Sequence, residues 1–293
     1  ALVAAAPAYL KTNSHGEFVF DHAWAHAYAQ HDVAYYPKWL VAVPYTPVTG
    51  PRLLARTPGH RRRLLEAMCE HARAEGLSSI HVNFAPPAQL DAGGEDWLAR
   101  NDIQFHWQRR PGWRDFQDFL DSLERKKRKN IRAERRQVHA AGVRLRVVHG
   151  DEASATEIQA LHALYCTGFA SKGNSPAMTS AFFHHLATAM PRQLVMVLAE
   201  RDGDLLAGAI CLRDSRRLYG RYWGSRVEVP GLHFEACYYQ GIEYCLREGL
   251  EVFEPGAQGE HKVARGFLPV ITHSRHWVAH PGFREALAGW CYE

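Results

Sequence analysis

Segments typical of strands and helices alternate along residues 1–110, and this alternation limits the chain to layered α/β architectures. The clearest helix has Thr57 as its N-cap, Pro58 at its first position and Gly76 just beyond its end. An apolar run typical of a strand follows it at Ser79–Phe84. We therefore predict a first α/β domain in which helices cover a sheet.

Two further segments of this half carry weaker signals. The apolar run Leu2–Leu10 predicts a buried strand, and Glu95–Arg100 predicts a short helix. The sequence begins without an initiator Met, so we expect this first domain to lack its N-terminal strands.

The second half, residues 111–293, predicts another α/β domain. Its first part reads as one long helix, Trp113–Ala141, which ends before Gly142. A meander of strands follows, with a turn at Asp202-Gly203. After it come a helix at Leu232–Glu248 and a final strand near Val270–Val278.

Composition indicates an ordinary globular protein. Of the 293 residues, 46% are hydrophobic, and the net charge is only +4. The six cysteines form no C-x-x-C pair, which favours reduced thiols and a cytoplasmic location. No run approaches the roughly 20 apolar residues of a membrane span. The oligomeric state cannot be read from these features.

Positive charge is concentrated in the predicted long helix. Eight Lys and Arg residues lie between Arg125 and Arg136, and such density is self-repulsive unless an anion offsets it. Phosphate, in tRNA or in coenzyme A, is the natural counter-group. The alternative is a solvated helix face without a ligand. The candidate donor- or phosphate-binding residues are Arg125, Lys126, Lys127, Arg128, Lys129 and Arg132.

Polar groups able to catalyse acyl transfer are concentrated in the segment Glu254–Lys262 and in Arg265, shortly after it. Glycines and a proline predict that this segment is a loop after a strand, where α/β proteins place their sites. His261 or Glu254 could serve as the base, and Lys262 could stabilise the oxyanion. The alternative is that these side chains only hold a surface loop in place. The candidate substrate-binding residues are Gln258, Glu235, His233, Tyr238 and Arg265.

We predict no metal site, although a set of histidines and glutamates lies in this part of the chain. His261, His273 and His276 with two glutamates could supply ligands, but no H-E-x-x-H spacing or equivalent occurs.

Two motifs resemble those of Fem-like transferases in the GNAT superfamily. The stretch from Leu120 through Lys129-Asn130-Ile131-Arg132 to Gly142-Val143 is similar to the opening of their second domain. The cluster Glu260-His261-Lys262, followed by Gly266-Phe267, resembles their late lysine motif. Two other stretches, Val43–Arg52 and Phe253–Lys262, are similar to bacterial proteins labelled FemAB-like. The likeness extends over nearly the whole chain.

The resemblance implies tandem GNAT-like domains, with mixed sheets flanked by helices, and an enzyme that transfers acyl groups. It implies no tightly bound cofactor but a co-substrate, either aminoacyl-tRNA or acyl-CoA. The turn expected to bind coenzyme A is not intact at Arg226–His233, which favours aminoacyl-tRNA. Our leading hypothesis is aminoacyl transfer to an amine of a small or peptide-like acceptor. The alternatives are an acyl-CoA-dependent N-acyltransferase and a non-catalytic protein that binds nucleic acid or another partner on the same fold.

Overall fold

A computed structural model describes residues 1–171, 173–257 and 259–292, and these form two compact units. Unit 1 comprises Ala1–Gln104 and Val270–Glu293, and unit 2 comprises Phe105–Pro269. Strands β6 (Trp97–Gln108) and β12 (Leu268–Val278) have residues in both units. Within the described residues, no helix is long and apolar enough to cross a membrane.

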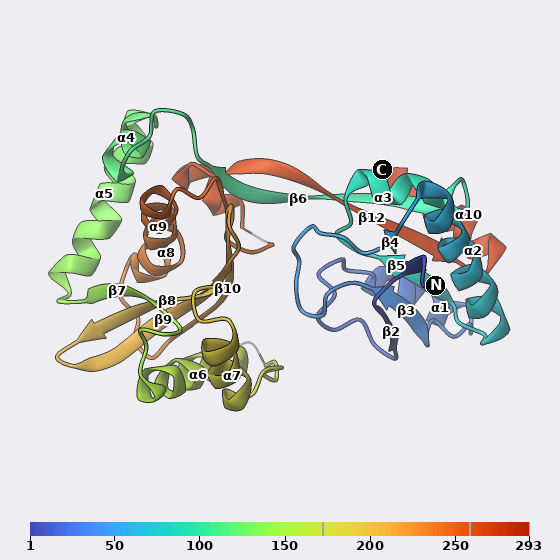
Figure 1. The fold of residues 1–293 in the computed structure, drawn as a ribbon, viewed down its shortest axis with the longest axis horizontal. Coiled ribbons are helices and arrows are strands. Elements are labelled where there is room, and N and C mark those ends of the chain that lie inside the picture. The colour runs from blue at the N-terminus through green and yellow to red at the C-terminus, as the bar shows by residue number, and fades with distance from the viewer. Residues whose placement is uncertain (172, 258, 293) are drawn as a thin grey trace. The chain divides into compact units, whose positions relative to one another are not determined.

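Unit 1 contains a mixed sheet with the strand order β2-β3-β5-β12-β6 (Figure 1). Strands β3 and β5 are parallel, whereas β2 pairs with β3, and β12 with β5, in antiparallel fashion. A separate antiparallel pair joins β1 to β4. The elements of this unit, besides β6 and β12, are β1 (Ala4–Ala5), β2 (Ala8–Lys11), α1 (His22–Gln30), β3 (Lys38–Val41), β4 (Leu54–Ala55), α2 (Pro58–Ala74), β5 (Ser79–Val82), α3 (Pro87–Leu90), a 3₁₀ turn (Asp91–Gly93) and α10 (Pro281–Tyr292).

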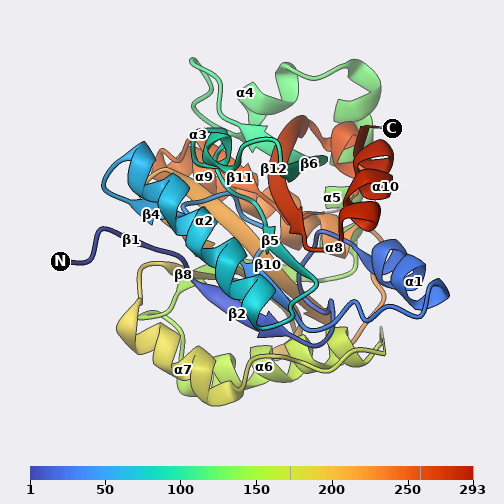
Figure 2. The ribbon, with the colours of Figure 1, turned by 90° about the vertical axis from the view of Figure 1, so that its right-hand side faces the viewer.

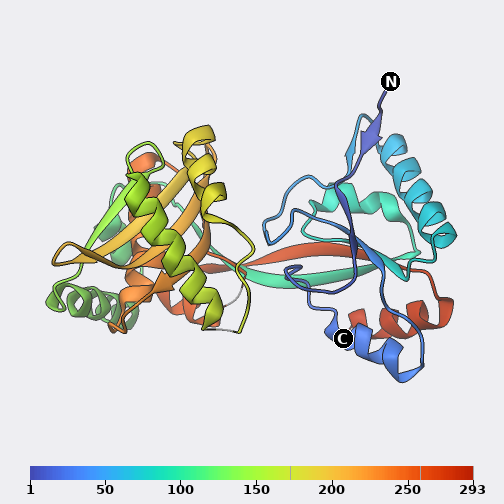
Figure 3. The same ribbon diagram turned by 90° about the horizontal axis from the view of Figure 1, so that it is seen from below.

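The two faces of this sheet differ in chemistry. Ile80, Val82 and Trp277 lie on one face and pack in an apolar core with α2, which begins beside β4 in Figure 2. The opposite face carries His81 of β5 and His276 of β12, which are paired in register and buried. Helices α1 and α10 lie side by side (Figure 3), with Trp24 of α1 against the two histidine rings.

Unit 2 contains the strand order β6-β11-β10-β9-β8-β7, and among its described residues β10 and β11 form a parallel pair while the other neighbours pair in antiparallel fashion. Helices α6 and α7 pack together, and α6 lies against β9 and β10 (Figure 1). The elements of this unit are α4 (Phe116–Asp121), α5 (Arg125–Ala140), β7 (Arg144–His149), α6 (Ala155–Ala170), α7 (Ser180–Ala189), β8 (Leu194–Arg201), β9 (Asp204–Arg213), β10 (Arg217–Ser225), α8 (Leu232–Phe234), a π-helical segment (Glu235–Tyr239), α9 (Gln240–Glu248), β11 (Val252–Glu254) and a 3₁₀ helix (Glu260–Arg265).

The predicted α/β architecture, with mixed sheets flanked by helices, is confirmed. The helix signal at Thr57 is confirmed in detail, because its side chain accepts a hydrogen bond from the backbone of His60. All six cysteines are free in the part of the chain that the structure describes.

Other predictions of local structure need correction. Leu2–Leu10 is not one buried strand but contributes to the two short strands β1, which is half-buried, and β2, which is mostly exposed. Glu95–Arg100 is not a helix, because β6 begins at Trp97. The predicted helix Trp113–Ala141 is two helices, since the backbone of Glu124 is extended between α4 and α5.

The end of the chain belongs to a different unit from the one that the sequence indicated. A division into 1–110 and 111–293 assigns Val270–Glu293 to the second half, whereas the structure places it in unit 1. The reason is strand pairing, because β12 forms a ladder with β5, and α10 then packs against α1.

Candidate functional site

Lys262 is the most deeply buried of the predicted site residues that the structure describes. It lies on the 3₁₀ helix Glu260–Arg265, between Gly259 and Gly266, both of which have positive φ. The residue is only 1% exposed, and its Nζ donates a hydrogen bond to the carbonyl of Gly256 at 2.7 Å. Burial lowers the pKa of Lys262 to about 8, because charge is poorly solvated there. The sequence predicted a loop here because of its glycines. Glycines disfavour a long helix or strand, but they allow this short 3₁₀ helix, which takes the place of the loop over Glu260–Lys262.

His261 is exposed and joined to the helix Leu232–Glu248. Its Nε2 and the Tyr238 hydroxyl lie 2.8 Å apart, and its ring also contacts Phe234. Burial of part of the ring, together with Arg265 and Lys262, lowers the pKa of His261. The imidazole is therefore mainly neutral near pH 7 and able to accept a proton.

The π-helical segment Glu235–Tyr239 carries side chains that contact the 3₁₀ helix and α5. Such segments insert an extra residue into a turn and occur often at functional sites. Tyr238 reaches His261, while Tyr239 donates a hydrogen bond to Glu134 of α5. The predicted helix Leu232–Glu248 is thus present over its full length, with a π-helical turn within it.

Arg265 connects the 3₁₀ helix to α5. Its Nη2 lies 2.5 Å from Glu134 Oε1, and its guanidinium stacks 3.4 Å above the Phe234 ring. It also donates to the backbone carbonyl of His261. These contacts occupy much of its hydrogen-bonding capacity, so Arg265 holds Lys262 and His261 in position.

Two buried glutamates each have one free carboxylate oxygen. Glu254 Oε1 accepts from Arg217 at 2.5 Å, and its Oε2 has no hydrogen-bond partner among the described residues, with His106 Nε2 3.9 Å away. Glu235 is bound by Arg135 at 3.0 Å and has a similarly free Oε2. Burial raises the pKa of both carboxyl groups, although the neighbouring arginines oppose it. Both are thereby better proton acceptors than an exposed glutamate.

The remaining predicted substrate residues differ in placement. His233 is exposed and its ring packs edge-to-face against Trp223 and Tyr238. Gln258 lies outside the described residues. Among the described residues, no group of three or more His, Cys, Asp and Glu side chains could hold a metal ion.

The basic helix α5 has two stripes with different roles. Arg128 and Arg135 face inward with Ile131, and they bind the carbonyl of Leu123 and the carboxylates of Glu235 and Glu243. A second, neighbouring stripe is exposed, and no carboxylate in the described ranges lies within 4 Å of it. This outer stripe consists of Arg125, Lys126, Lys129, Arg132 and Arg136. The structure therefore separates Arg128 from the other predicted phosphate-binding residues and adds Arg136 to the exposed stripe. Lys127 lies outside this stripe, with its Nζ 3.9 Å from Glu124 Oε1.

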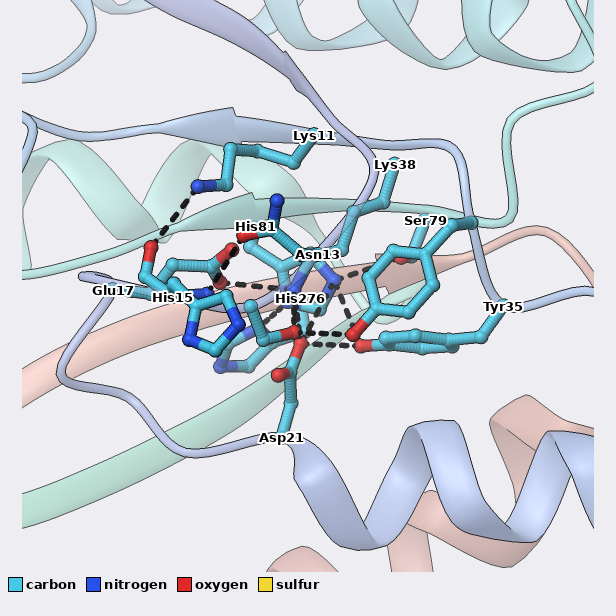
Figure 4. A network of polar contacts seen from close by, with 12 residues as sticks. Lys11, Asn13, His15, Glu17, Asp21, Tyr35, Lys38, Ser79, His81 and His276 are labelled. Atoms are coloured by element: carbon cyan, nitrogen blue, oxygen red, sulfur yellow. Dashed lines mark hydrogen bonds and ion pairs between the residues drawn. The ribbon is translucent and has the colours of Figure 1, made fainter. Parts of the chain in front are cut away.

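The sequence reasoning missed a second polar cluster, in unit 1. Lys38 donates to Ser14 and Glu17 at 2.9 Å and also to Asp21, and Figure 4 shows its side chain in one polar network with Tyr35, His81 and His276. The overlooked signal is polar residues with period two inside apolar strands. These are Ser79, His81 and Asn83, and Thr272, Ser274 and His276.

Comparisons with known proteins place this architecture among Fem-like folds. The C-terminal domain of a putative lysylphosphatidylglycerol synthetase from Agrobacterium fabrum is 14% identical, with a TM-score of 0.58 over 85% of this chain and 80% of that chain. The structure of L-PGS from Bacillus licheniformis is 10% identical, with a TM-score of 0.56 over 87% and 83%. FemX is 11% identical, with a TM-score of 0.51 over 87% and 84%.

The sequence itself gives the family. The chain belongs to the FemAB-like family, described as peptidoglycan biosynthesis/recognition, whose model matches residues 1–293. No curated protein matches the chain. The resemblance stated from the Lys126–Arg132 and Glu260–Phe267 motifs is thereby confirmed.

Proposed function

We propose that this protein is an amide-forming transferase that moves an aminoacyl group from aminoacyl-tRNA to an amine of a small or peptide-like acceptor. The observation that carries the proposal is Lys262, a buried ammonium group beside the exposed His261. Membership of the FemAB-like family supports acyl transfer. The name of the similar Agrobacterium protein also describes a product that carries a lysyl group.

The chemistry assigned to these residues follows from the needs of acyl transfer. The amine nitrogen attacks the ester carbonyl, the new C–N bond forms, and the C–O bond to the tRNA ribose breaks. Lys262 stabilises the negative oxygen of the tetrahedral intermediate, and with a pKa of about 8 it remains mostly protonated at pH 7. His261 or Glu254 takes the proton from the attacking amine and, as the conjugate acid, returns it to the ribose oxygen, which leaves as a hydroxyl.

The outer stripe of α5 supports tRNA as the donor. Its five cations have no carboxylate partners in the described residues, and two of them, Arg125 and Lys126, lie in the first turn of the helix, where the macrodipole disfavours positive charge. A phosphate backbone would offset both costs.

The test is consumption of the donor. Purified protein is incubated with a pool of aminoacyl-tRNA or with acyl-CoAs, each with a panel of primary amines, and amide products are measured by mass spectrometry. We expect amides from aminoacyl-tRNA with the wild type and little product with Lys262→Met. The matched control is Lys127→Met, which removes a cation from α5 outside the outer stripe.

Each outcome has a meaning. Products only from acyl-CoA select the N-acyltransferase alternative. Absence of product from either donor, with folded protein that still binds tRNA, selects the non-catalytic alternative. Full activity of Lys262→Met contradicts the role assigned to Lys262.

A further inference from the structure

The polar face of the unit 1 sheet is covered by the segment Lys11–Asp21. This segment has no helix between β2 and α1, and its backbone has positive φ at Gly16 and Phe18. Ser14, Glu17 and Asp21 point inward from it and meet Lys38 of β3, as Figure 4 shows for the labelled residues. The segment is therefore attached to this face through the buried ammonium group of Lys38 and through hydrogen bonds of Asp21 and Ser14 with Tyr35 and Tyr36.

The charges in this cluster do not balance. Lys38 is a single cation shared by the carboxyl groups of Glu17 and Asp21, and all three residues are at most 3% exposed. The two neighbouring histidines add no charge, because burial lowers the pKa of His81 to about 3 and that of His276 well below its ordinary value. With both carboxyl groups ionised, the cluster carries one excess negative charge in a region of low dielectric, which is unfavourable without a counter-charge.

Unpaired polar atoms accompany this excess charge. Glu17 Oε1, Asp21 Oδ1 and His276 Nε2 have no hydrogen-bond partner among the described residues. The same holds for both side-chain atoms of Asn83, which follows β5 two residues after His81 on the same face and is 0% exposed. Buried polar groups are nearly always paired, so this concentration within one cluster calls for a ligand.

We propose that this face of unit 1 is a binding site for a primary ammonium group, held by the free oxygens of Glu17 and Asp21. These two oxygens belong to carboxylates that share Lys38, and they can accept hydrogen bonds from the N–H donors of an ammonium group. Its positive charge neutralises the carboxylate that Lys38 leaves uncompensated. This site involves only unit 1 and does not depend on the reaction proposed for unit 2.

Aromatic rings around the cluster fit the same ligand. The Lys38 ammonium already lies 5.2 Å from the centre of the Tyr35 ring and 5.7 Å from that of Tyr36. Trp24 packs on the rings of both histidines, and its Nε1 is itself unpaired. Aromatic faces attract cations, so these rings favour an ammonium group over a neutral hydroxyl of similar size.

Because Glu17, Asp21 and Lys38 are at most 3% exposed, a ligand can reach them only if the covering segment Lys11–Asp21 moves. Its surface contact, a hydrogen bond of 3.0 Å from Lys11 Nζ to the carbonyl of His15, is exposed. Ser14 is held to the half-buried Tyr36 by a further hydrogen bond of 2.8 Å.

The test is a titration followed by NMR of the full chain. The side-chain amide of Asn83 and the indole N–H of Trp24 are local probes, assigned with Asn83→Leu and Trp24→Phe. We expect propylammonium chloride to shift both signals saturably, with a dissociation constant on the order of 1–10 mM for so small a ligand. We expect 1-propanol and potassium chloride at equal concentrations to leave them unchanged.

Variants locate the site. Glu17→Gln keeps the shape of the side chain and removes its charge, so we expect at least about tenfold weaker binding. Glu95→Gln, which changes an exposed carboxylate of the same unit, and Lys262→Met in unit 2 should bind as the wild type does. Absence of saturation, an equal response to propanol, or full affinity in a folded Glu17→Gln overturns the proposal. If Glu17→Gln does not fold, the wild-type comparison of propylammonium with propanol decides alone.

Discussion

The outer stripe of α5 makes a quantitative prediction about binding to tRNA. Its cations at positions 125, 129, 132 and 136 follow spacings of four, three and four residues, so they lie on one side of the helix, with Lys126 beside them. Each cation that contacts a phosphate releases a counterion, and the logarithm of the binding constant falls by about 0.7 to 0.9 per contact for each unit in the logarithm of salt concentration. Five contacts therefore predict a slope of about −3.5 to −4.5.

This slope is large enough to measure easily. Between 50 and 200 mM salt, the affinity for tRNA should fall by about 100- to 500-fold. Fluorescence anisotropy with labelled tRNA across this range gives the slope directly. Changing Arg125, Lys129 and Arg132 together to Gln should reduce its size by about two to three, while the unfolding free energy should change little because these side chains are exposed.

A matched control separates local contacts from the effect of net charge. Arg62 and Arg63 are exposed on α2 of unit 1, and changing both to Gln lowers net charge without altering α5. We expect the wild-type slope in this control. A flat salt dependence in the wild type, or an equal loss of slope in the control, would refute the assignment of α5 as the phosphate-binding surface.

Three further predictions concern pH and stability. Burial lowers the pKa of Lys262 to about 8, so between pH 8 and 10.5 the unfolded chain binds more protons than the folded one, and the wild type should gain about 3 kcal/mol of stability relative to Lys262→Met across this window. Denaturant titrations of both proteins at both pH values measure the gain, and a stability difference that does not change with pH contradicts burial of the charge. Lys38→Met should lower the free energy of unfolding by about 3–5 kcal/mol, since it leaves two buried carboxyl groups without a cation. Adding Asp21→Asn to this variant should restore part of that free energy in urea unfolding, and no restoration would count against the ion pair. Gly224→Ala should destabilise the protein by about 1–3 kcal/mol, because the new Cβ would lie 2.0 Å from the Leu164 carbonyl oxygen. Gly289→Ala, on α10 with no atom within 4 Å of the new Cβ, should be neutral or stabilising by up to about 1 kcal/mol, and similar melting temperatures for the two variants would contradict the close packing at Gly224.

The sequence predicted those helices that are marked by local signals, such as a capping residue or a regular spacing of apolar residues. The N-cap and Pro58 predicted the start of α2, and apolar spacing predicted the helix from Leu232 to Glu248. The π-helical turn within that helix was not predictable from this pattern, because one extra residue in a turn leaves most of the apolar stripe intact. The break at Glu124 was also hidden, since neither glycine nor proline marks it.

Long-range pairing explains what the sequence left open. The strand near Val270–Val278 was predicted, but its pairing with Ser79–Val82, about 190 positions earlier, leaves no local trace. For the same reason the cluster in unit 1 was missed. Glu17, Lys38 and His276 come from distant segments, whereas His261, Lys262 and Arg265 are close in sequence and their grouping could be read directly.

The position of β12 in unit 1 has a consequence for how the chain folds during synthesis. Unit 2 is continuous in sequence and is complete once residue 269 has been made, whereas unit 1 must wait for a strand made after it. The intervening 165 residues, from 105 to 269, take roughly 8 to 30 s at ribosomal rates of about 5–20 residues per second. During that time β5 can pair with β3 but lacks its other partner, β12, and His81 faces the surroundings without His276. The first segment to emerge is therefore the last to reach its native state, and it is the part of the nascent chain that most needs protection from aggregation.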